Sequence, residues 1–318
     1  MARVIARRRL VYDGGADLAL DRPGHVRSAS GLARWGDRLA VVSDDANFVG
    51  VLDPATGACH PIALPVGADG RRQFDVGRGN KLAKLDLESL FADGDRLIAL
   101  GSDSGVAVRR HAIVVDADGA RAVALPRLYA ALRRPELGRG ALNLEAATVL
   151  GDALVVGNRG GDVGDDGAPT RDGLARLPLA SVRALLVDPE GAPVPAVRWR
   201  LLELGALAGV TLRLTELAAW RGRLFYAATA EATTSAYDDG AVAGSAIGVI
   251  DGVIDRDGDG GIDGDGARWA PVVDEAGAPL VAKLEGLVAD GANLLAAVDA
   301  DDPAAASELL VLALDGPW

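Results

Sequence analysis

Hydrophobic and polar residues recur in the same order at five places along the chain. Each copy spans sixteen residues: a short alternating stretch, a Gly-containing turn, and a second stretch rich in Leu, Val and Ala. Alternation of apolar and polar residues indicates a half-buried strand, and a tight turn between two such stretches indicates a β-hairpin. The five predicted hairpins begin at Ser30, Glu88, Glu145, Thr215 and Glu285.

Further strands follow several of these hairpins. Third strands are predicted over residues 49–53, 111–116, 247–251 and 308–315, and fourth strands over 121–125, 197–204 and 268–273. Four antiparallel strands per repeat are typical of a propeller blade. We therefore predict an all-β fold, a single β-propeller domain over residues 1–318 with five four-stranded blades. A sixth, degenerate blade between Glu145 and Glu285 is the alternative count, and a two-sheet sandwich is the alternative fold.

The two ends of the chain complement each other in this scheme. The N-terminal strand, residues 4–12, has no hairpin of its own, and the last repeat stops after its third strand at Leu314. We predict that the N-terminal strand completes the last blade and closes the ring. Short helices are predicted at 128–134 and 179–186, where the apolar spacing is close to 3.6 residues.

Polar residues flank the start of every repeat, with one apolar residue between them. Side chains two positions apart share one face of a strand, and the innermost strand of each propeller blade lines the axis. The pattern predicts ten polar side chains around one channel: Ser28, Ser30, Asp86, Glu88, Asn143, Glu145, Arg213, Thr215, Lys283 and Glu285. The simpler interpretation is that they only solvate a water-filled channel.

Acids and bases are mixed in this ring, which favours a chemical role. Crowded carboxylates are unfavourable unless they pair with cations or bind a metal. We predict that Glu88, Glu145 and Glu285 hold a divalent ion, Ca²⁺, that activates water. The predicted substrate-binding residues are Arg159, Arg213, Lys283, Asn158 and Tyr237, and the predicted proton-transfer residue is Asp103 or Asp299.

A second metal site is predicted in an Asp-rich loop. Residues 255–265 follow a D-x-D-x-D-G pattern, in which alternate carboxylates wrap a hard cation. Position twelve is Gly266, where a bidentate Glu is usual. The candidate Ca²⁺ ligands are Asp255, Asp257, Asp259 and Asp263, and an exposed Asp-Gly turn is the alternative.

Several motifs carry family resemblances. Glu285-Gly286-Leu287, with degenerate copies at Glu88 and Glu145, resembles the blade opening of the phytase-like propeller group, named for an esterase-like activity of phytase. That resemblance implies phosphoester or ester hydrolysis, usually with a metal. The segments Ser30–Leu32, Asn143–Ala146, Asn158–Gly160 and Ala236–Gly240 resemble more closely a bacterial uncharacterised propeller family.

The amino-acid composition limits the classes of partner and the cellular location that we expect. The net charge of −12 argues against binding to nucleic acid or to anionic membrane. The single cysteine, Cys59, excludes an intrachain disulfide, and no apolar run approaches the roughly 20 residues of a membrane span. The N-terminus has no secretory h-region. We expect a cytoplasmic protein, with an exported mature form as the alternative.

Two functions from different classes remain open. The first is a metal-assisted hydrolase acting on a small anionic ester, either a phosphate ester or a lactone. The second is a non-catalytic propeller that binds a ligand or a protein partner.

Overall fold

The chain folds almost entirely into β-strands. A computed structural model describes residues 1–138, 142–161, 164, 167–232, 240–250, 267–316 and 318. Two α-helices, α1 (Pro126–Leu132) and α2 (Leu179–Val187), lie within a few residues of their predicted positions. Helix η3 (Pro135–Leu137) is a single 3₁₀ turn. In the described part of the chain, no helix has the length and apolar character needed to cross a membrane.

Three sheets follow one another along the first two thirds of the chain. The first has the order β2-β6-β5-β4-β3, the second β10-β9-β8-β7, and the third β11-β12-β13-β14. Their strands are β2 (Val11–Tyr12), β3 (Ala29–Trp35), β4 (Arg38–Ser43), β5 (Phe48–Leu52), β6 (Ala58–Ala63), β7 (Leu87–Asp93), β8 (Arg96–Gly101), β9 (His111–Asp116), β10 (Gly119–Ala124), β11 (Leu144–Leu150), β12 (Ala153–Asn158), β13 (Gly173–Pro178) and β14 (Trp199–Leu201).

The remaining strands form one nine-stranded sheet. Its order is β15-β16-β17-β18-β19-β1-β22-β21-β20. Its strands are β1 (Ala2–Arg9), β15 (Ala206–Leu207), β16 (Val210–Trp220), β17 (Arg223–Ala232), β18 (Ala241–Ile250), β19 (Ala267–Val273), β20 (Lys283–Asp290), β21 (Asn293–Asp299) and β22 (Glu308–Leu314).

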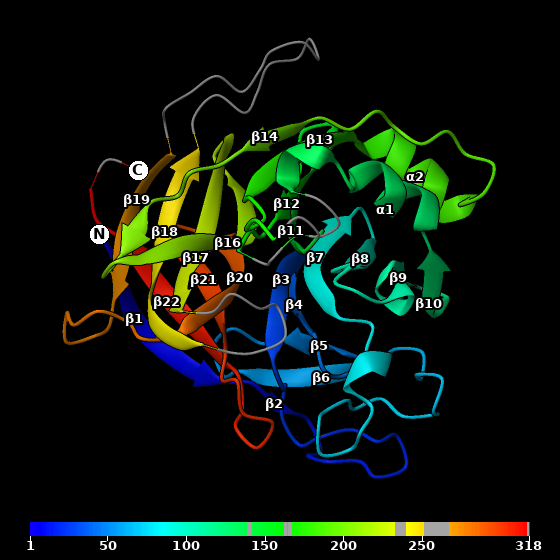
Figure 1. Cartoon of the computed structure of the whole chain (residues 1–318). Coiled ribbons are helices and arrows are strands. Elements are labelled where there is room, and N and C mark those ends of the chain that lie inside the picture. Colours follow the sequence, from blue (N-terminus) through cyan, green and yellow to red (C-terminus); the bar gives the residue numbers. More distant parts are fainter. Residues whose placement is uncertain (139–141, 162–163, 165–166, 233–239, 251–266, 317) are drawn as a thin grey trace.

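The N-terminal strand joins the two ends of the chain, as the sequence predicted. β1 pairs antiparallel with β22 and touches β19 in parallel through Ala2 and Arg3 only. In Figure 1 the blue β1 and the red β22 lie side by side, near both chain termini. The nine-stranded sheet therefore consists of two antiparallel groups, β15 to β19 and β20 to β22 with β1, bridged by this short parallel contact.

Five inner strands surround one axis. β3 contacts β7, β7 contacts β11, β11 contacts β16, β16 contacts β20, and β20 contacts β3. Their labels gather around the middle of Figure 1, while α1 and α2 lie at the rim. The buried hydrophobic side chains of the described residues form five clusters, each shared by two neighbouring groups of strands. The architecture is therefore all-β and propeller-like.

Each inner strand carries a β-bulge at the same repeat position. The pairing register with the second strand skips one residue in all five cases: Ser30, Glu88, Glu145, Thr215 and Glu285. These are the residues at which the repeats were predicted to begin. A bulge leaves one residue outside the ladder and re-aims its side chain. The repeated bulge thus prepares one side chain per inner strand to face the axis.

Small residues follow the bulge and let the inner strands approach closely. A Cβ added to Gly31 would lie 2.9 Å from the backbone nitrogen of Leu90, and one added to Gly286 would lie 2.9 Å from the Cβ of Leu32. The equivalent residue is Ser89 in β7 and Ala146 in β11. The exception is Glu216 in β16, which is described with the site.

Candidate functional site

A cavity of about 560 Å³ opens at one end of the axis. Nine of the ten side chains predicted to surround the channel line it; Thr215 is the exception and is fully buried. The lining also includes residues from loops and second-strand ends, among them Asp44, Asp45, Arg159, Glu231 and Asp299. The predicted convergence of polar side chains from separate repeats is therefore present in the structure.

Arg159 connects three acids of the cavity. Its guanidinium lies 2.6 Å from a carboxylate oxygen of Glu231, 3.7 Å from one of Glu285 and 3.8 Å from one of Glu145. Asn143 donates a further hydrogen bond of 2.7 Å to Glu145. Because the three acids raise its pKa, Arg159 keeps its charge despite the burial that opposes it.

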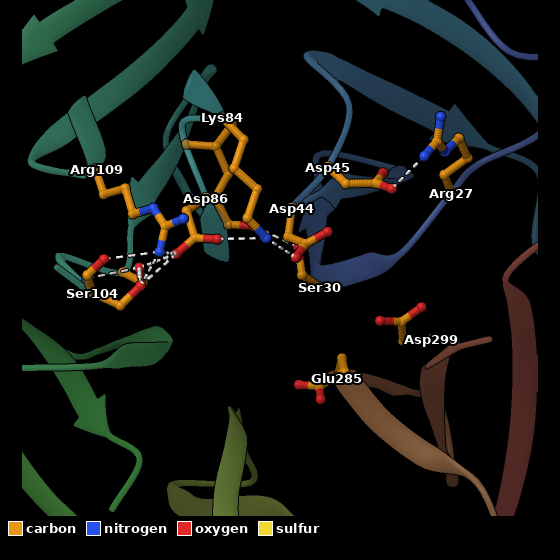
Figure 2. Close-up of polar contacts among 12 residues, drawn as sticks. Arg27, Ser30, Asp44, Asp45, Lys84, Asp86, Ser104, Arg109, Glu285 and Asp299 are labelled. Carbon is orange, nitrogen blue, oxygen red and sulfur yellow. Dashed lines mark hydrogen bonds and ion pairs between the residues drawn. The ribbon is translucent and has the colours of Figure 1, made fainter. Parts of the chain in front are cut away.

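Lys84 has the corresponding position on the opposite side of the cavity. Its ammonium lies 2.5 Å from Asp44 Oδ2 and 2.6 Å from Asp86 Oδ1. Lys84 directly follows the 3₁₀ helix η1 (Lys81–Ala83), and Arg109 ends η2 (Ala107–Arg109), 3.1 Å from the other oxygen of Asp86. Figure 2 shows Lys84 between Asp44 and Asp86, with Arg109 on the far side of Asp86.

Neighbouring carboxyls in this cavity have their pKa values pushed in opposite directions. Burial opposes ionisation of Asp86, but the charges of Lys84 and Arg109 lower its pKa below the ordinary value. Glu88 follows two residues later, at the bulge of β7, where burial raises its pKa well above the ordinary value and the charges of Glu145 and Asp44 add to the effect.

The pKa values of a second pair of carboxyls, Glu285 and Glu231, are also shifted in opposite directions. Burial raises the pKa of Glu285 to about 8, with Lys283 and Arg159 opposing and Glu145 adding to the rise. For Glu231, burial is outweighed by the charges of Lys283 and Arg159, which lower its pKa. One cavity thus holds neighbouring carboxyls whose pKa values are shifted in opposite directions.

The acidic group close enough to share a metal ion differs from the predicted one. Among the described residues, carboxylate oxygens of Asp44, Asp86 and Glu88 lie within 4.8 Å of one another. Of the three predicted ligands, only Glu88 belongs to this group. Glu145 and Glu285 are instead bridged by Arg159, whose positive charge takes the place of an ion. The Asp44 group in turn already contains the ammonium of Lys84.

Two predicted site residues, Asp103 and Asn158, are not part of the cavity lining. The carboxylate of Asp103 is fully buried and accepts hydrogen bonds from Arg110 and Arg133, at 2.6 to 2.8 Å. The side chain of Asn158 accepts from the backbone of Asn143 and donates to two backbone carbonyls. Both side chains hold loops in place, so neither is positioned to touch a ligand in the cavity.

The predicted cations line the cavity but already face carboxylates. Arg213 lies 2.9 Å from Asp172, and the ammonium of Lys283 lies 3.5 Å from Glu285 and 3.4 Å from Asp301. Asp299 also lines the cavity. The remaining predictions, Tyr237 and the loop ligands Asp255, Asp257, Asp259 and Asp263, lie outside the described residues.

Sequence reasoning missed Lys84 and Glu216. Lys84 stands two residues before Asp86, so it extends the alternating polar face by one step, a signal that was available. Glu216 breaks the column of small residues after the bulge. Its fully buried carboxylate accepts the backbone N–H of Leu217 at 2.9 Å. Burial raises its pKa well above the ordinary value, against hydrogen bonds from the backbones of Leu217, Ala147 and Leu32.

Glu216 separates two different mouths of the axis. The backbone groups that hydrogen-bond to the Glu216 carboxylate belong to β3, β11 and β16. This carboxylate therefore lies between inner strands of three different sheets. At the other mouth is a smaller cavity of about 170 Å³ lined almost entirely by apolar residues, among them Leu32, Leu90, Ala147, Leu217 and Leu287. The titratable side chains are therefore gathered in the larger, polar cavity.

The chain matches the family described as "Family of unknown function (DUF6929)" over residues 25–314. It belongs to that family. The match gives no support to the resemblance to the phytase-like group. No curated protein matches the chain.

Two solved structures are similar to the chain at low identity. The crystal structure of Myxococcus xanthus glutaminyl cyclase shares 13% identity, covers 99% of this chain and 96% of its own, and gives a TM-score of 0.43. The computationally designed Ika8 protein also shares 13% identity, with coverages of 95% and 74% and a TM-score of 0.34. Likeness at this level does not bear on chemistry.

Proposed function

We propose that the axial cavity is the active site of a hydrolase that acts on a small ester or lactone. The observation that carries the proposal is the separation of pKa values within one cavity, where burial raises the pKa of Glu285 and Glu88 while neighbouring cations lower that of Glu231 and Asp86. Carboxyls whose environments push their pKa values apart are suited to acid and base roles.

Glu285 is the proposed proton-transfer residue. Its pKa of about 8 lies near neutrality, where a group can both accept and return a proton. In the proposed reaction Glu285 takes a proton from water as the water oxygen attacks the carbonyl carbon. When the carbon–oxygen bond to the leaving group breaks, Glu285 returns the proton to the alkoxide. The products are a carboxylic acid and an alcohol.

Lys283 and Arg159 would stabilise the charge of the tetrahedral intermediate. Their nitrogens lie 3.5 Å and 3.7 Å from the same oxygen of Glu285. Positive charge held in a buried site lowers the energy of a developing oxyanion. The phosphate ester predicted from sequence is less favoured, because ten carboxyl side chains line the cavity against six Lys and Arg side chains.

The five-blade count supports this geometry and is part of the proposal. Five inner strands in a closed ring and five shared hydrophobic clusters favour five blades. In that arrangement each blade presents its bulged residue to the same axis, so residues far apart in sequence act in one site.

The test is hydrolysis of p-nitrophenyl acetate and γ-butyrolactone by the purified protein and by Glu285→Gln. We expect kcat/KM to fall by about 100-fold or more in the variant, the usual contribution of a general acid or base. Glu275→Gln, at an exposed glutamate paired with Arg7, is the matched control and should retain activity. Equal rates in Glu285→Gln and Glu275→Gln would exclude the assigned role, and ligand binding without hydrolysis would favour the non-catalytic alternative.

Metal-assisted hydrolysis is the second candidate, supported by the close approach of Asp44, Asp86 and Glu88. A Ca²⁺ ion there would meet the Lys84 ammonium at the same oxygens. Calcium should therefore bind Lys84→Met more tightly than the unmodified protein, as measured by calorimetry. Calcium-dependent activity of the unmodified protein, abolished by EDTA, would favour the metal-assisted reaction over the metal-free one.

A further inference from the structure

We propose that the substrate carries a positively charged organic ammonium group, held in the axial cavity by the carboxyl groups of Glu285, Asp299 and Asp44, of which Glu285 and Asp299 release their protons as the ammonium binds. This inference names the substrate class of the proposed hydrolase and rests on that proposal. It would make amine-bearing esters or lactones the preferred substrates over neutral ones.

Glu285 is the main reason. Its side chain lines the cavity, the residue is only 3% exposed, and neither carboxylate oxygen has a hydrogen-bond partner among the residues that the structure describes. The nearest cations, Lys283 and Arg159, lie at 3.5 Å and 3.7 Å from Oε1, and each is shared with other acids. Buried polar atoms in folded proteins are nearly always hydrogen-bonded. A ligand that brings N–H donors would complete this carboxylate.

Asp44 and Asp299 supply further acceptors in the same cavity. Asp44 accepts a hydrogen bond from Lys84 through Oδ2, while its buried Oδ1 has no hydrogen-bond partner in the described part of the chain. Asp299 accepts a backbone N–H from Asp301, and burial, together with the Asp44 charge, raises its pKa well above the ordinary value. Figure 2 shows Glu285 and Asp299 across an open space from Asp44 and Ser30.

The spacing favours an organic ammonium over a bare metal ion. A metal ion needs several carboxylate oxygens gathered at 2.3–2.6 Å around one point. Among the described residues, the group that meets such spacing is Asp44, Asp86 and Glu88, where the Lys84 ammonium already lies. Glu285 and Asp299 are not part of it. An ammonium on a carbon chain can donate to more widely separated acceptors, as Lys84 itself does.

The charges around the cavity also disfavour an anionic ligand. Arg159 and Arg213, two of the cations predicted to hold an anion, lie 2.6 Å and 2.9 Å from carboxylates of this chain. An anion would have to break these pairs, whereas an ammonium would leave them intact. The acidic excess would also attract a cation electrostatically before it enters.

The test compares three ligands of similar size and different charge: n-butylammonium, n-butanol and butyrate. Each is titrated against the full-length protein at pH 7, with calorimetry and the thermal unfolding midpoint as readouts. We expect n-butylammonium to bind and raise the midpoint, and the other two to have little effect. Equal or stronger binding of butyrate would overturn the proposal.

Single substitutions test which residues bind the ammonium group. Glu285→Gln keeps the shape but cannot ionise to pair with the ammonium, and we expect at least tenfold weaker binding of n-butylammonium, with no change in Glu275→Gln. If Glu285→Gln does not fold, Asp299→Asn provides the same comparison. Unchanged binding in the folded variant would overturn the proposal. A calcium chloride titration that raises the midpoint more than n-butylammonium does would replace the ammonium with a metal ion.

The two proposals fail separately. Hydrolysis of p-nitrophenyl acetate without any preference for ammonium ligands would refute only the substrate class. Selective binding of n-butylammonium by a protein that hydrolyses no ester would refute only the hydrolase.

Discussion

Single residues in the cavity differ sharply in how well their charge is compensated. Asp86 is held by Lys84 and Arg109, whereas Glu285 has cations only beyond hydrogen-bond distance. A buried pair is strongly destabilised when one partner is lost, because the other charge stays buried. The same burial leaves an uncompensated carboxyl protonated. A compensated carboxylate such as Asp86 is tested by removing its cation, and an uncompensated carboxyl such as Glu285 is tested by varying the pH.

Lys84→Met should destabilise the fold strongly. The substitution leaves Asp44 and Asp86 without the ammonium between them, and we expect a loss of about 3–5 kcal/mol in the free energy of unfolding. The comparison is Arg34→Met, which removes an exposed partner of Asp290 and should cost at most about 1 kcal/mol. Urea denaturation of both variants checks the difference, and similar losses would contradict it.

Glu285 should make stability depend on pH. Its folded-state pKa of about 8 lies above the ordinary value of 4.5, so the folded state binds more protons than the unfolded state between these values. The free energy of unfolding should therefore fall as pH rises through this window, by up to about 1.4 kcal/mol per pH unit for this group. Glu285→Gln should show a flatter profile than the unmodified protein in urea titrations at pH 5 to 8. An unchanged slope would show that Glu285 is already ionised when folded.

The inner strand of each repeat is the element that positions the cavity side chains. Its bulge occurs at the same repeat position in all five copies, and the residue after it is small in four of them. The bulge aims a polar side chain at the axis, and the small residue lets the next inner strand come close enough to share the cavity. Both features are needed for residues of separate repeats to meet.

Gly286→Ala tests the close approach. The new Cβ would lie 2.9 Å from the Cβ of Leu32 and 3.0 Å from that of Ala297, so one inner strand must shift. We expect a loss of about 1–3 kcal/mol, the usual cost of overpacking. Ser89→Ala at the same repeat position removes a buried hydroxyl that has no partner, and should be neutral or stabilising. Thermal unfolding distinguishes the two, and a neutral Gly286→Ala would show that the inner strands can separate freely.

At the scale of the whole molecule, the ring depends on its N-terminal strand. β1 provides the outer strand beside β22 and also contacts β19, so it links the last group of strands to the one before it. Ala2 and Val4 on its inner face are fully buried in the cluster shared by these groups, while Ile5 is half exposed. Closing the ring holds the five inner strands at fixed positions around the cavity.

Val4→Asp should therefore weaken the closure. An unpaired charge buried in the shared cluster is expected to cost several kcal/mol. Ile5→Asp, one residue further along the same strand, should change stability by no more than about 0.5 kcal/mol. Thermal unfolding and limited proteolysis of the N-terminus should separate the two variants. Equal stability would mean that β1 is dispensable for the ring.

The sequence by itself determined the strand content, the repeat and most of the polar side chains that meet. Alternation with a period of two specifies which side chains share a face of a strand. Repetition of the pattern indicates that the corresponding strands of all repeats turn the same face toward the axis. Nine of ten predicted ring residues line the cavity for this reason. The pairing of the N-terminal strand with β22 followed from counting strands in the last repeat.

The tertiary structure decided what these side chains do to one another. Which acid pairs with which cation depends on distances between strands of different repeats, and these are not encoded in any local pattern. Arg159 therefore took the place expected for a metal ion between Glu145 and Glu285, and Lys84 entered the group of Asp44 and Asp86. Asp103 and Asn158 stand at the expected strand ends, but loop packing keeps them out of the cavity lining. Local periodicity specifies the direction of a side chain, whereas its charge state and partners depend on packing across the axis.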